Sequence, residues 1–491
     1  MGKYSVPPQI LALKPDGTMV KNKNDHYYVY DYECHRIRNG LDKDGKTRWK
    51  IVTKMGSCIG QITEEDGFVS NGAKRWMDEI TVLEYGAYAY SRKISKDTFE
   101  KLKEFFIRKD AKQIYVCGLI IFNEGFTYMK DMSTKYDESA LNRFIPNIKV
   151  GYDALSELYY YLGRRTGRCV DLQQKLINNS SKEIAVDGHV IACASQKNDL
   201  SEYGYKAKKL GTSQINYMAA YDVLDDMPLA SSIYNGAIPD KSALQQLFGK
   251  FSFYDCMFYV DRGFNTKSDK ELMSINGNTY IVPMIRGRED YKKVYELIKF
   301  DKRRWFVYGK DGYSSTIYYQ EFKGEGNIRY FAFLDVTRQD AERRTYMEKL
   351  RNGVKGYSQE GLESNEKDFG LFLLETNDIS LTPEQIFTGY KKRWKIETFY
   401  DYIDNSIDFN ALYQQDYCRT EGVGFIVHVA GMIYHDLRSE LKKYNYSVRE
   451  VMDALSGLKA VNEHSKWAIR NNNKARQTIA DTIGFEIPNY I

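Results

Sequence analysis

The chain has 491 residues, and at roughly 150 residues per domain this length indicates about three folding units. Its 71 Lys and Arg residues nearly balance 66 Asp and Glu residues, which leaves a net charge of only +5. This balance excludes a wholly basic protein, so any nucleic-acid surface must be a local patch. A hydrophobic content of 43% and a charged content of 28% are typical of a globular protein.

The cysteines and the apolar runs indicate the cellular setting. None of the seven cysteines forms a Cys-x-x-Cys pair, which argues against a zinc knuckle or a disulfide scaffold. The N-terminal residues contain no apolar signal segment. No apolar run reaches the roughly 18 residues of a membrane span. We therefore expect an intracellular protein with no membrane partner.

Residues 1–95 are predicted to form a β-rich module. Two alternating runs, residues 26–37 and 49–62, flank the turn signal DKDG at 42–45. Residues 1–60 contain 11 Lys or Arg against 6 Asp or Glu, and aromatic residues are interleaved with these charges. This pattern marks a candidate face for binding nucleic acid. The alternative is a solvated β-sheet with ordinary Lys-rich edges.

A helical segment, residues 96–180, leads into an α/β core whose first part spans 181–285. In the core we expect strands at 183–193, 214–223, 228–236, 255–260 and 279–284, with helices at 239–250 and 268–276. Residues 286–378 are predicted to be a β-rich insertion, with strands within 305–334, a KDG turn at 310–312, a charged helix at 337–353 and a strand at 369–377.

The second part of the core, residues 379–445, has the clearest start signal in the chain. Thr382, Pro383 and Gln385 provide an N-cap, a proline at the first helical position and the third residue of a capping box. This helix is expected to run to about Ile403, and a strongly apolar, buried helix should follow at 421–443. Residues 446–491 are predicted to be helical, with a basic cluster at Lys466, Arg470, Lys474 and Arg476.

Three carboxylates stand out by their positions. Asp187 interrupts an apolar strand, Asp261 ends one, and Glu397 lies in the middle of a helix. A buried carboxylate is costly unless it is paired or bound to metal, and α/β sheets place their sites at the carboxyl ends of strands. At about 100° per residue, Tyr390, Arg393, Glu397 and Asp404 share one helical face. Two interpretations follow: a site for a metal and a phosphate backbone, or salt-bridged carboxylates on a solvated polar stripe.

The motif Tyr390-x-x-Arg393-x-x-x-Glu397 resembles the signature helix of DDE transposases of insertion-sequence family 4. Further landmarks occur in the family's order: VDGHVI at 186–191, Gly204-Tyr205 with Gln214-Ile215, the segment from Pro228 to Asp240, VDRGF at 260–264, and the β-rich insertion. The family signature ends in a Lys seven residues after the Glu, where this chain has Asp404.

The resemblance implies an RNase H-like core in which Asp187, Asp261 and Glu397 are the catalytic residues. They would bind two Mg²⁺ ions, or Mn²⁺ as a substitute, because carboxylates are hard oxygen ligands. Water would first cleave the phosphodiester at the transposon end, and the freed 3′-hydroxyl would then attack target DNA. Four side chains would contact DNA: Arg393 at a phosphate, Tyr390 beside it, Arg419 at the backbone, and Trp305 at a flipped base. For Trp305 the alternative is a core aromatic of the insertion.

The implied protein is thus a DNA transposase that binds double-stranded inverted repeats and target DNA. It would act as a homodimer on paired ends, in the prokaryotic cytoplasm, associated with the nucleoid. Two alternatives remain open at this point. One is a catalytically degenerate or domesticated DNA-binding protein, which the Asp404 departure favours. The other is a structure-selective RNase H-like nuclease that cleaves without joining strands.

Overall fold

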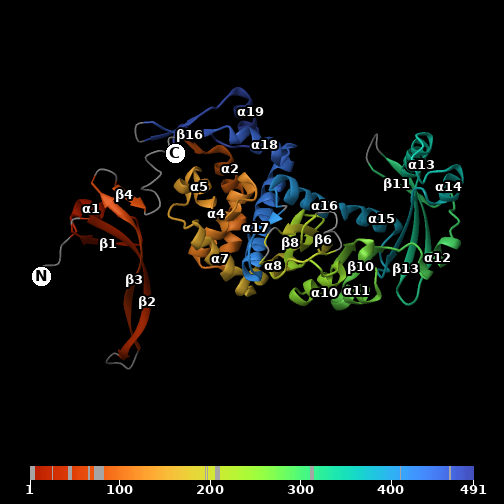
Figure 1. Cartoon of the computed structure of the whole chain (residues 1–491), viewed down its shortest axis with the longest axis horizontal. Helices are drawn as coiled ribbons and strands as arrows, with labels where there is room; N and C mark the ends of the chain where they lie inside the picture. Colours follow the sequence, from red (N-terminus) through yellow and green to blue (C-terminus); the bar gives the residue numbers. More distant parts are fainter. Residues whose placement is uncertain are drawn as a thin grey trace. The chain divides into compact units, whose positions relative to one another are not determined.

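The computed structural model describes residues 6–24, 26–41, 47–64, 67–70, 82–193, 195, 197–204, 211–309, 314–409, 411–463 and 466–491. The turns predicted at 42–45 and 310–312, and Tyr205, lie outside the described residues. The chain divides into two compact units (Figure 1). Unit 1 comprises residues 1–94, 128–152 and 440–491, and unit 2 comprises residues 95–127 and 153–439.

Unit 1 begins with the predicted β-rich module. A short helix, α1 (Pro8–Ala12), precedes an antiparallel sheet in the order β1-β2-β3-β4, formed by β1 (Thr18–Lys23), β2 (His26–Leu41), β3 (Thr47–Thr63) and β4 (Gly67–Ser70). Ile10, Val29 and Ile62 form its small buried core. Strands β2 and β3 continue well beyond β1 and β4 as a two-stranded ribbon (Figure 1).

The remainder of unit 1 combines helices with a second sheet. Its helices are α2 (Gly86–Ile94), α5 (Met132–Asp137), α6 (Leu141–Phe144), α18 (Val448–Ser456) and α19 (Lys474–Thr482). The sheet has the order β17-β16-β5, from β5 (Val82–Glu84), β16 (Lys459–Glu463) and β17 (Lys466–Arg470). The C-terminal segment therefore contains a hairpin as well as the predicted helices. The three consecutive residues Trp467 to Ile469 are buried in β17, which pairs with β16, and β16 pairs in turn with distant β5.

Unit 2 contains a helical layer around the long buried helix α17 (Tyr417–Leu441), which matches the predicted apolar helix. Its other members are α3 (Lys96–Phe105), α4 (Arg108–Glu124), α7 (Tyr152–Arg164) and α8 (Gly167–Asn178). Gly118 of α4 lies against Val429 of α17, where a Cβ atom would fall 3.0 Å from the Val429 side chain. The absence of a side chain at Gly118 thus lets α4 pack closely on α17 within the helical layer.

The core is one mixed sheet of ten strands. Strands β8 (Met227–Asn235), β7 (Gln214–Asp222) and β6 (Glu183–Cys193) are antiparallel, and β6 pairs in parallel with β9 (Met257–Val260), as β9 does with β10 (Thr279–Pro283). The short β15 (Ala411–Leu412) pairs with the end of β6. Three antiparallel strands followed by two parallel ones form the RNase H-like arrangement predicted from the sequence.

The strands predicted within the insertion extend this same sheet. The order continues from β10 through β14 (Leu371–Thr376), β13 (Arg329–Asp335) and β12 (Ser315–Lys323) to β11 (Trp305–Tyr308), all antiparallel. Helix α12 (Glu289–Glu296) covers part of one face. The charged helix α13 (Val336–Arg351) and α14 (Gln359–Asn365) complete the segment. We find no helix in the described part of the chain that is long and apolar enough to cross a membrane.

Helices that follow the strands position the carboxylates. Helices α10 (Asp240–Lys250) and α11 (Lys267–Leu272) follow β8 and β9, and β9 is separated from α11 by the short turn Arg262–Phe264. The predicted start at Thr382 is confirmed, because Thr382 and Gln385 form both bonds of a capping box. The helix consists of α15 (Pro383–Lys392), α16 (Trp394–Asp401) and a final π-helical turn, Tyr402–Ser406.

Candidate active site

Asp187 and Asp261 are neighbours on adjacent parallel strands. The register of β6 and β9 pairs Val186 with Val260. Asp187 is the next residue of β6, and Asp261 directly follows the end of β9 in extended conformation. Adjacent strands lie about 4.8 Å apart, and side chains at the same level of parallel strands point to the same face. Two residues that are far apart in the sequence thus present their carboxylates side by side.

Arg393 joins the helix to these strands. Its guanidinium lies 3.6 Å from an Asp187 carboxylate oxygen and donates a 2.6 Å hydrogen bond to Glu397, four residues further along the helix. The Arg393 side chain is only 15% exposed, whereas that of Glu397 is 57% exposed. The guanidinium therefore occupies the space between the strand carboxylate and the helix carboxylate.

The pKa of Arg393 shows that all three acids lie close enough to affect its guanidinium. Burial lowers the pKa of Arg393, but neighbouring groups outweigh it and the net shift is upward. The groups that raise the pKa are Tyr390, Asp187, Asp261 and Glu397. Tyr390 is largely buried next to Arg393, and burial is the main reason that the pKa of its hydroxyl is raised. The structure thus brings five of the predicted site residues together.

The Asp187 carboxyl is strongly perturbed. Burial raises its pKa from 3.8 to about 6, and the charges of Asp261 and Asp240 add to the increase. The backbone N–H of Gly188, which donates a 2.8 Å hydrogen bond to the carboxylate, and the Arg393 guanidinium act in the opposite direction. Burial and the neighbouring acids thus outweigh the Arg393 guanidinium, and a carboxyl perturbed in this way is typical of a functional site.

The carboxylate oxygens of the three acids are suitable ligands for a hard divalent cation, but the three acids are not positioned to coordinate one ion together. Within the residues that the structure describes, no group of three or more His, Cys, Asp or Glu side chains is arranged to hold a metal ion. Asp187 and Asp261 are placed as adjacent ligands, and Glu397 is held by Arg393 instead. Glu397 can complete the set only by turning its exposed carboxylate away from Arg393.

A second group of side chains supports the strand that carries Asp187. The Tyr400 hydroxyl donates a 2.6 Å hydrogen bond to the Asp187 carbonyl, and its ring stacks on His189 at 4.9 Å. His189 Nε2 lies 2.8 Å from Asp404, the residue found where the family has Lys. Asp404 therefore pairs with His189 rather than joining the carboxylates, because the π-helical turn changes the helical phase expected from 100° per residue.

Asp240 is a fourth carboxylate near the strand acids. A Cβ atom on Gly188 would fall 3.0 Å from an Asp240 carboxylate oxygen, and the Asp240 charge raises the pKa of Asp187. In the sequence, Asp240 is the last residue of a family landmark that starts at Pro228, and no catalytic or DNA-binding role is predicted for it. Its position between a proline and an amphipathic helix is equally typical of a helix start, so only the tertiary contact reveals it.

Trp305 and Arg419 lie in very different environments. Trp305 is 53% exposed, so it is not a core aromatic of the insertion. Its strand β11 lies five strands from β9, about 24 Å at about 4.8 Å per strand. Trp305 pairs with Tyr318, and Tyr318 pairs with Leu334. This register places Trp305 near the same end of the sheet as Asp261, which follows β9.

Arg419 is occupied by contacts within the protein. Its guanidinium binds Asp416 at 2.5 Å, donates to the Ser156 hydroxyl at 2.8 Å and lies over the Tyr160 ring. None of these partners belongs to the carboxylate group. The described contacts therefore do not bring Arg419 to the site that the sequence analysis expected it to serve.

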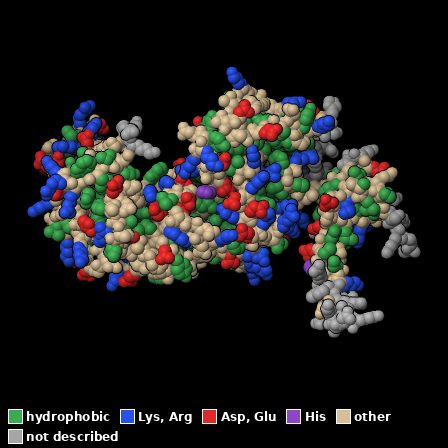
Figure 2. Space-filling model, turned by 180° about the vertical axis from the view of Figure 1, so that it is seen from behind, with side chains coloured by type: hydrophobic (Ala, Val, Ile, Leu, Met, Phe, Trp, Pro, Cys, Tyr) green, Lys and Arg blue, Asp and Glu red, His purple; other side chains and the backbone are tan. Residues whose placement is uncertain are grey.

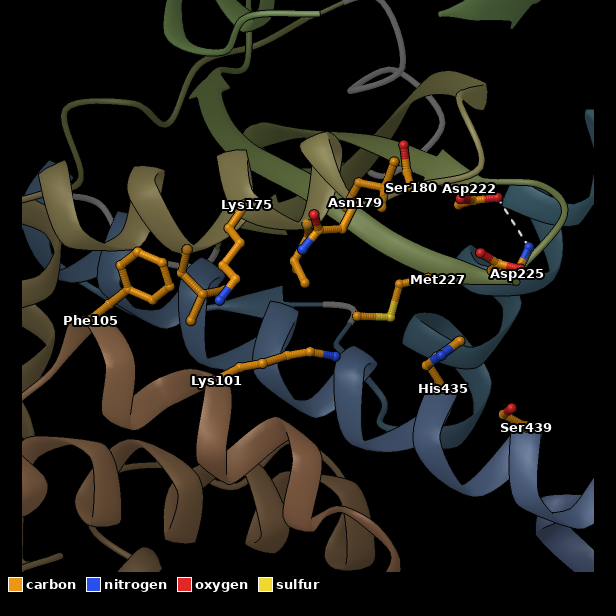
Figure 3. A pocket seen from close by; sticks show the side chains of 13 residues that line it. Lys101, Phe105, Lys175, Asn179, Ser180, Asp222, Asp225, Met227, His435 and Ser439 are labelled. Atoms are coloured by element: carbon orange, nitrogen blue, oxygen red, sulfur yellow. Dashed lines mark hydrogen bonds between the residues drawn. The ribbon is translucent and has the colours of Figure 1, made fainter.

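A cavity of about 270 Å³ lies elsewhere in unit 2, between α3, α8, α17 and the turn that joins β7 to β8 (Figure 3). Lys101 and Lys175 reach into it, and each is paired with a carboxylate of its own unit, Asp97 or Glu104. Asp222 lines the cavity and pairs in the sheet with Ile184. Ile184 lies near the start of β6, three residues before Asp187. The cavity is therefore separate from the carboxylate site.

The surface carries no single block of positive charge on the face drawn in Figure 2, where Lys and Arg side chains are interspersed with Asp and Glu. This distribution agrees with the near balance of charges in the sequence.

Comparisons with known proteins place this site in a family context. Residues 178–413, just under half of the chain, match the family model described as Transposase DDE domain. A search of the curated proteins finds no match. Among solved structures, the cryo-EM structure of a piggyBac transposase synaptic complex with hairpin DNA aligns with a TM-score of 0.39 and 10% identity, over 71% of this chain and 70% of that chain. The segment that contains Asp187, Asp261 and Glu397 is therefore similar to a transposase DDE domain.

Proposed function

We propose that the protein is a DNA transposase that cleaves phosphodiester bonds at transposon ends and joins the freed ends to target DNA. Asp187, Asp261 and Glu397 would be its catalytic residues. The match of residues 178–413 to a transposase DDE domain supports this reading. The observation that carries it is the convergence of the three acids on one guanidinium, that of Arg393.

The carboxylates fit divalent metal ions by their chemistry and by the desolvation of Asp187. When bound, two Mg²⁺ or Mn²⁺ ions would activate the attacking oxygen and stabilise the leaving oxygen. Asp187 and Asp261 would hold them from the strands. Glu397 would complete the set after its carboxylate turns away from the guanidinium, a movement that its exposure allows.

Arg393 would have two successive roles. In the metal-free protein its guanidinium neutralises carboxylates that would otherwise repel one another. When DNA arrives, the same guanidinium would contact a phosphate beside the scissile bond, because its planar donors match phosphate oxygens in pairs. Tyr390, which packs beside it, would orient it.

The narrower assignment to insertion-sequence family 4 rests on the order of the motifs and on the β-rich insertion. Trp305, exposed on the edge strand of the insertion, would stack on a base that has left the duplex. The His189–Asp404 pair takes the place of the family's Lys contact and would steady the strand next to Asp187. The enzyme would act as a homodimer on paired ends at the nucleoid, since two ends must be processed together.

A cleavage and joining assay tests the proposal. The substrate is a labelled duplex that carries the terminal repeat of the element, with Mg²⁺ or Mn²⁺ added. We expect cleavage at the end, its loss in Asp261→Ala, and joining of a pre-cut end to a second duplex. Glu397→Gln should bind the duplex almost as tightly as the wild type while cleaving poorly. Binding without cleavage would support a degenerate DNA-binding protein, and cleavage without joining would support a nuclease.

A further inference from the structure

We propose that the two-stranded ribbon of unit 1 is an arm that enters the major groove of the element's end DNA and reads its sequence. We define the arm as Tyr32–Arg38 of β2 paired with Trp49–Met55 of β3. The inference rests on the proposed function, because it names the surface by which the transposase would recognise its own ends.

The arm leaves its sheet at an irregular point. Among the described residues, β1 pairs with β2 only as far as Asp31, and β4 pairs with β3 only as far back as Gly60. The register of β2 and β3 shifts between Val29 and Tyr32, as in a β-bulge. A Cβ atom on Gly56 would fall 2.1 Å from an Asp31 carboxylate oxygen, so a larger residue there would require the Asp31 side chain to move. Bulges bend a strand pair and fix its direction, which aims the arm away from the sheet.

Both faces of the arm are open to solvent at residues 33–35 and 50–55, where the side chains are described. Glu33, Cys34 and His35 are exposed in succession on β2, and so are residues 50–57 on β3. Because successive side chains in a strand point to opposite faces, consecutive exposed residues mean that neither face is covered. The two strands contact only each other along the arm, as far as the described residues go.

Such a ribbon is poorly suited to stand alone in water. An isolated two-stranded hairpin is marginally stable at best, and this one presents apolar side chains outward. Ile51 is 61% exposed, Met55 39% and Val52 37%. Adjacent exposed positions on opposite faces, such as Ile51 and Val52, would both be buried by a partner that surrounds the ribbon, as a groove does.

The charge of the arm points to nucleic acid as that partner. The fourteen residues contain Arg36, Arg38, Lys50 and Lys54 against one acid, Glu33. They thus carry +3 of the net +5 of the whole chain. A second copy of this positively charged arm would repel it, whereas phosphates on both walls of a groove would attract it.

The dimensions agree with a DNA groove. The arm has seven paired positions, and at about 3.4 Å per residue it spans about 24 Å. The major groove is about 12 Å wide and admits a two-stranded ribbon. Apolar side chains can then contact thymine methyl groups at base edges, which gives sequence readout. Readout serves the element's own ends, and we therefore assign the arm to end DNA rather than to target DNA.

The C-terminal basic cluster is a weaker rival for this role. The Arg470 guanidinium binds Glu463 at 2.5 Å, and Arg476 donates to the backbone carbonyls of Ala454 and Asn471. Two of the four cations in that cluster thus support the local fold. Lys466 and Lys474 are exposed, and they provide a matched pair for comparison with Lys50 and Lys54.

Binding measurements with the full-length protein test the inference. The probes are a labelled duplex with the sequence of the element's end and a shuffled duplex of equal composition, each titrated at several salt concentrations. Lys50→Gln with Lys54→Gln should weaken binding to both duplexes and reduce the slope of log affinity against log salt by about 1.8, for two lost phosphate contacts. Ile51→Ser with Val52→Ser should lower the preference for the end duplex by about tenfold.

The control pair is Lys466→Gln with Lys474→Gln, which should leave both quantities near those of the wild type. Circular dichroism and light scattering check that each variant is folded and of unchanged oligomeric state. The inference is overturned if both arm variants bind like the wild type, if they change only the oligomeric state, or if Ile51→Ser with Val52→Ser leaves the preference for the end duplex unchanged. If the wild type cleaves end DNA and the arm variants bind it normally, only the role of the arm is refuted. If the wild type binds no DNA, the proposed function is refuted as well.

Discussion

Replacing Asp187 by Asn should stabilise the metal-free protein at neutral pH. Burial raises the pKa of this carboxyl from 3.8 to about 6, so the folded protein holds a proton that the unfolded chain releases. Stability is therefore lost as pH rises through this window, and the loss is complete above about pH 6. A difference of about two pKa units corresponds to about 3 kcal/mol of unfolding free energy, since one unit is 1.36 kcal/mol.

The assay is thermal or denaturant unfolding of the wild type and of Asp187→Asn, at pH 4.5 and at pH 7.5, with a metal chelator present. We expect the variant to be more stable than the wild type by about 3 kcal/mol at pH 7.5 and by only about 1 kcal/mol at pH 4.5, where the folded carboxyl is still protonated. Asp171→Asn, on the exposed face of α8, is the matched control and should follow the wild type at both values. Equal stability of wild type and Asp187→Asn at pH 7.5 would show that the carboxylate is not desolvated as described.

Added Mg²⁺ gives the same experiment a second readout. A ligand that binds only the folded state stabilises it by about 2.7 kcal/mol at a concentration one hundred times its dissociation constant. The wild type should gain such stability at pH 7.5, and Asp187→Asn should gain little. A metal response that survives in the variant would mean that the ions bind elsewhere.

Three further predictions concern single residues. Gly163→Ala would place a Cβ atom 1.8 Å from the Cys418 carbonyl oxygen, and it should lower the unfolding free energy by about 3 kcal/mol, measured by denaturant unfolding. Asp404→Lys restores the family's residue but sets a cation against His189, and it should destabilise the protein by about 1–2 kcal/mol and reduce end cleavage. Trp305→Ala removes an exposed ring, so it should change stability by less than about 0.5 kcal/mol while slowing end processing in the cleavage assay.

Each of these changes has a matched control or a contrary outcome. Gly167→Ala meets no atom within 4 Å and should leave stability nearly unchanged. A gain of cleavage activity in Asp404→Lys would contradict the prediction, because it would mean that the His189–Asp404 pair reduces catalysis. Phe306→Ala, next to Trp305 but buried, should cost about 3 kcal/mol, which separates a folding role from a DNA-contact role in β11.

The local elements of this protein could be predicted from the sequence because their signals are local. The capping box at Thr382 depends on residues three apart, and the strand that carries Asp187 depends on a short apolar run. The same reasoning identified Asp261 as the residue that ends a strand, and Arg393 and Glu397 as neighbours one helical turn apart. These features require no knowledge of which strand pairs with which.

Only the tertiary structure decided what these residues meet. Asp187 lies beside Asp261 because β6 pairs in parallel with β9, a choice of partner and register set by burial of whole strands and not by any local signal. Long-range packing also placed Asp404 against His189, and it joined the insertion to the core sheet through β14. The C-terminal hairpin is strand rather than helix because Glu84 of β5, 375 residues before Lys459, pairs with it.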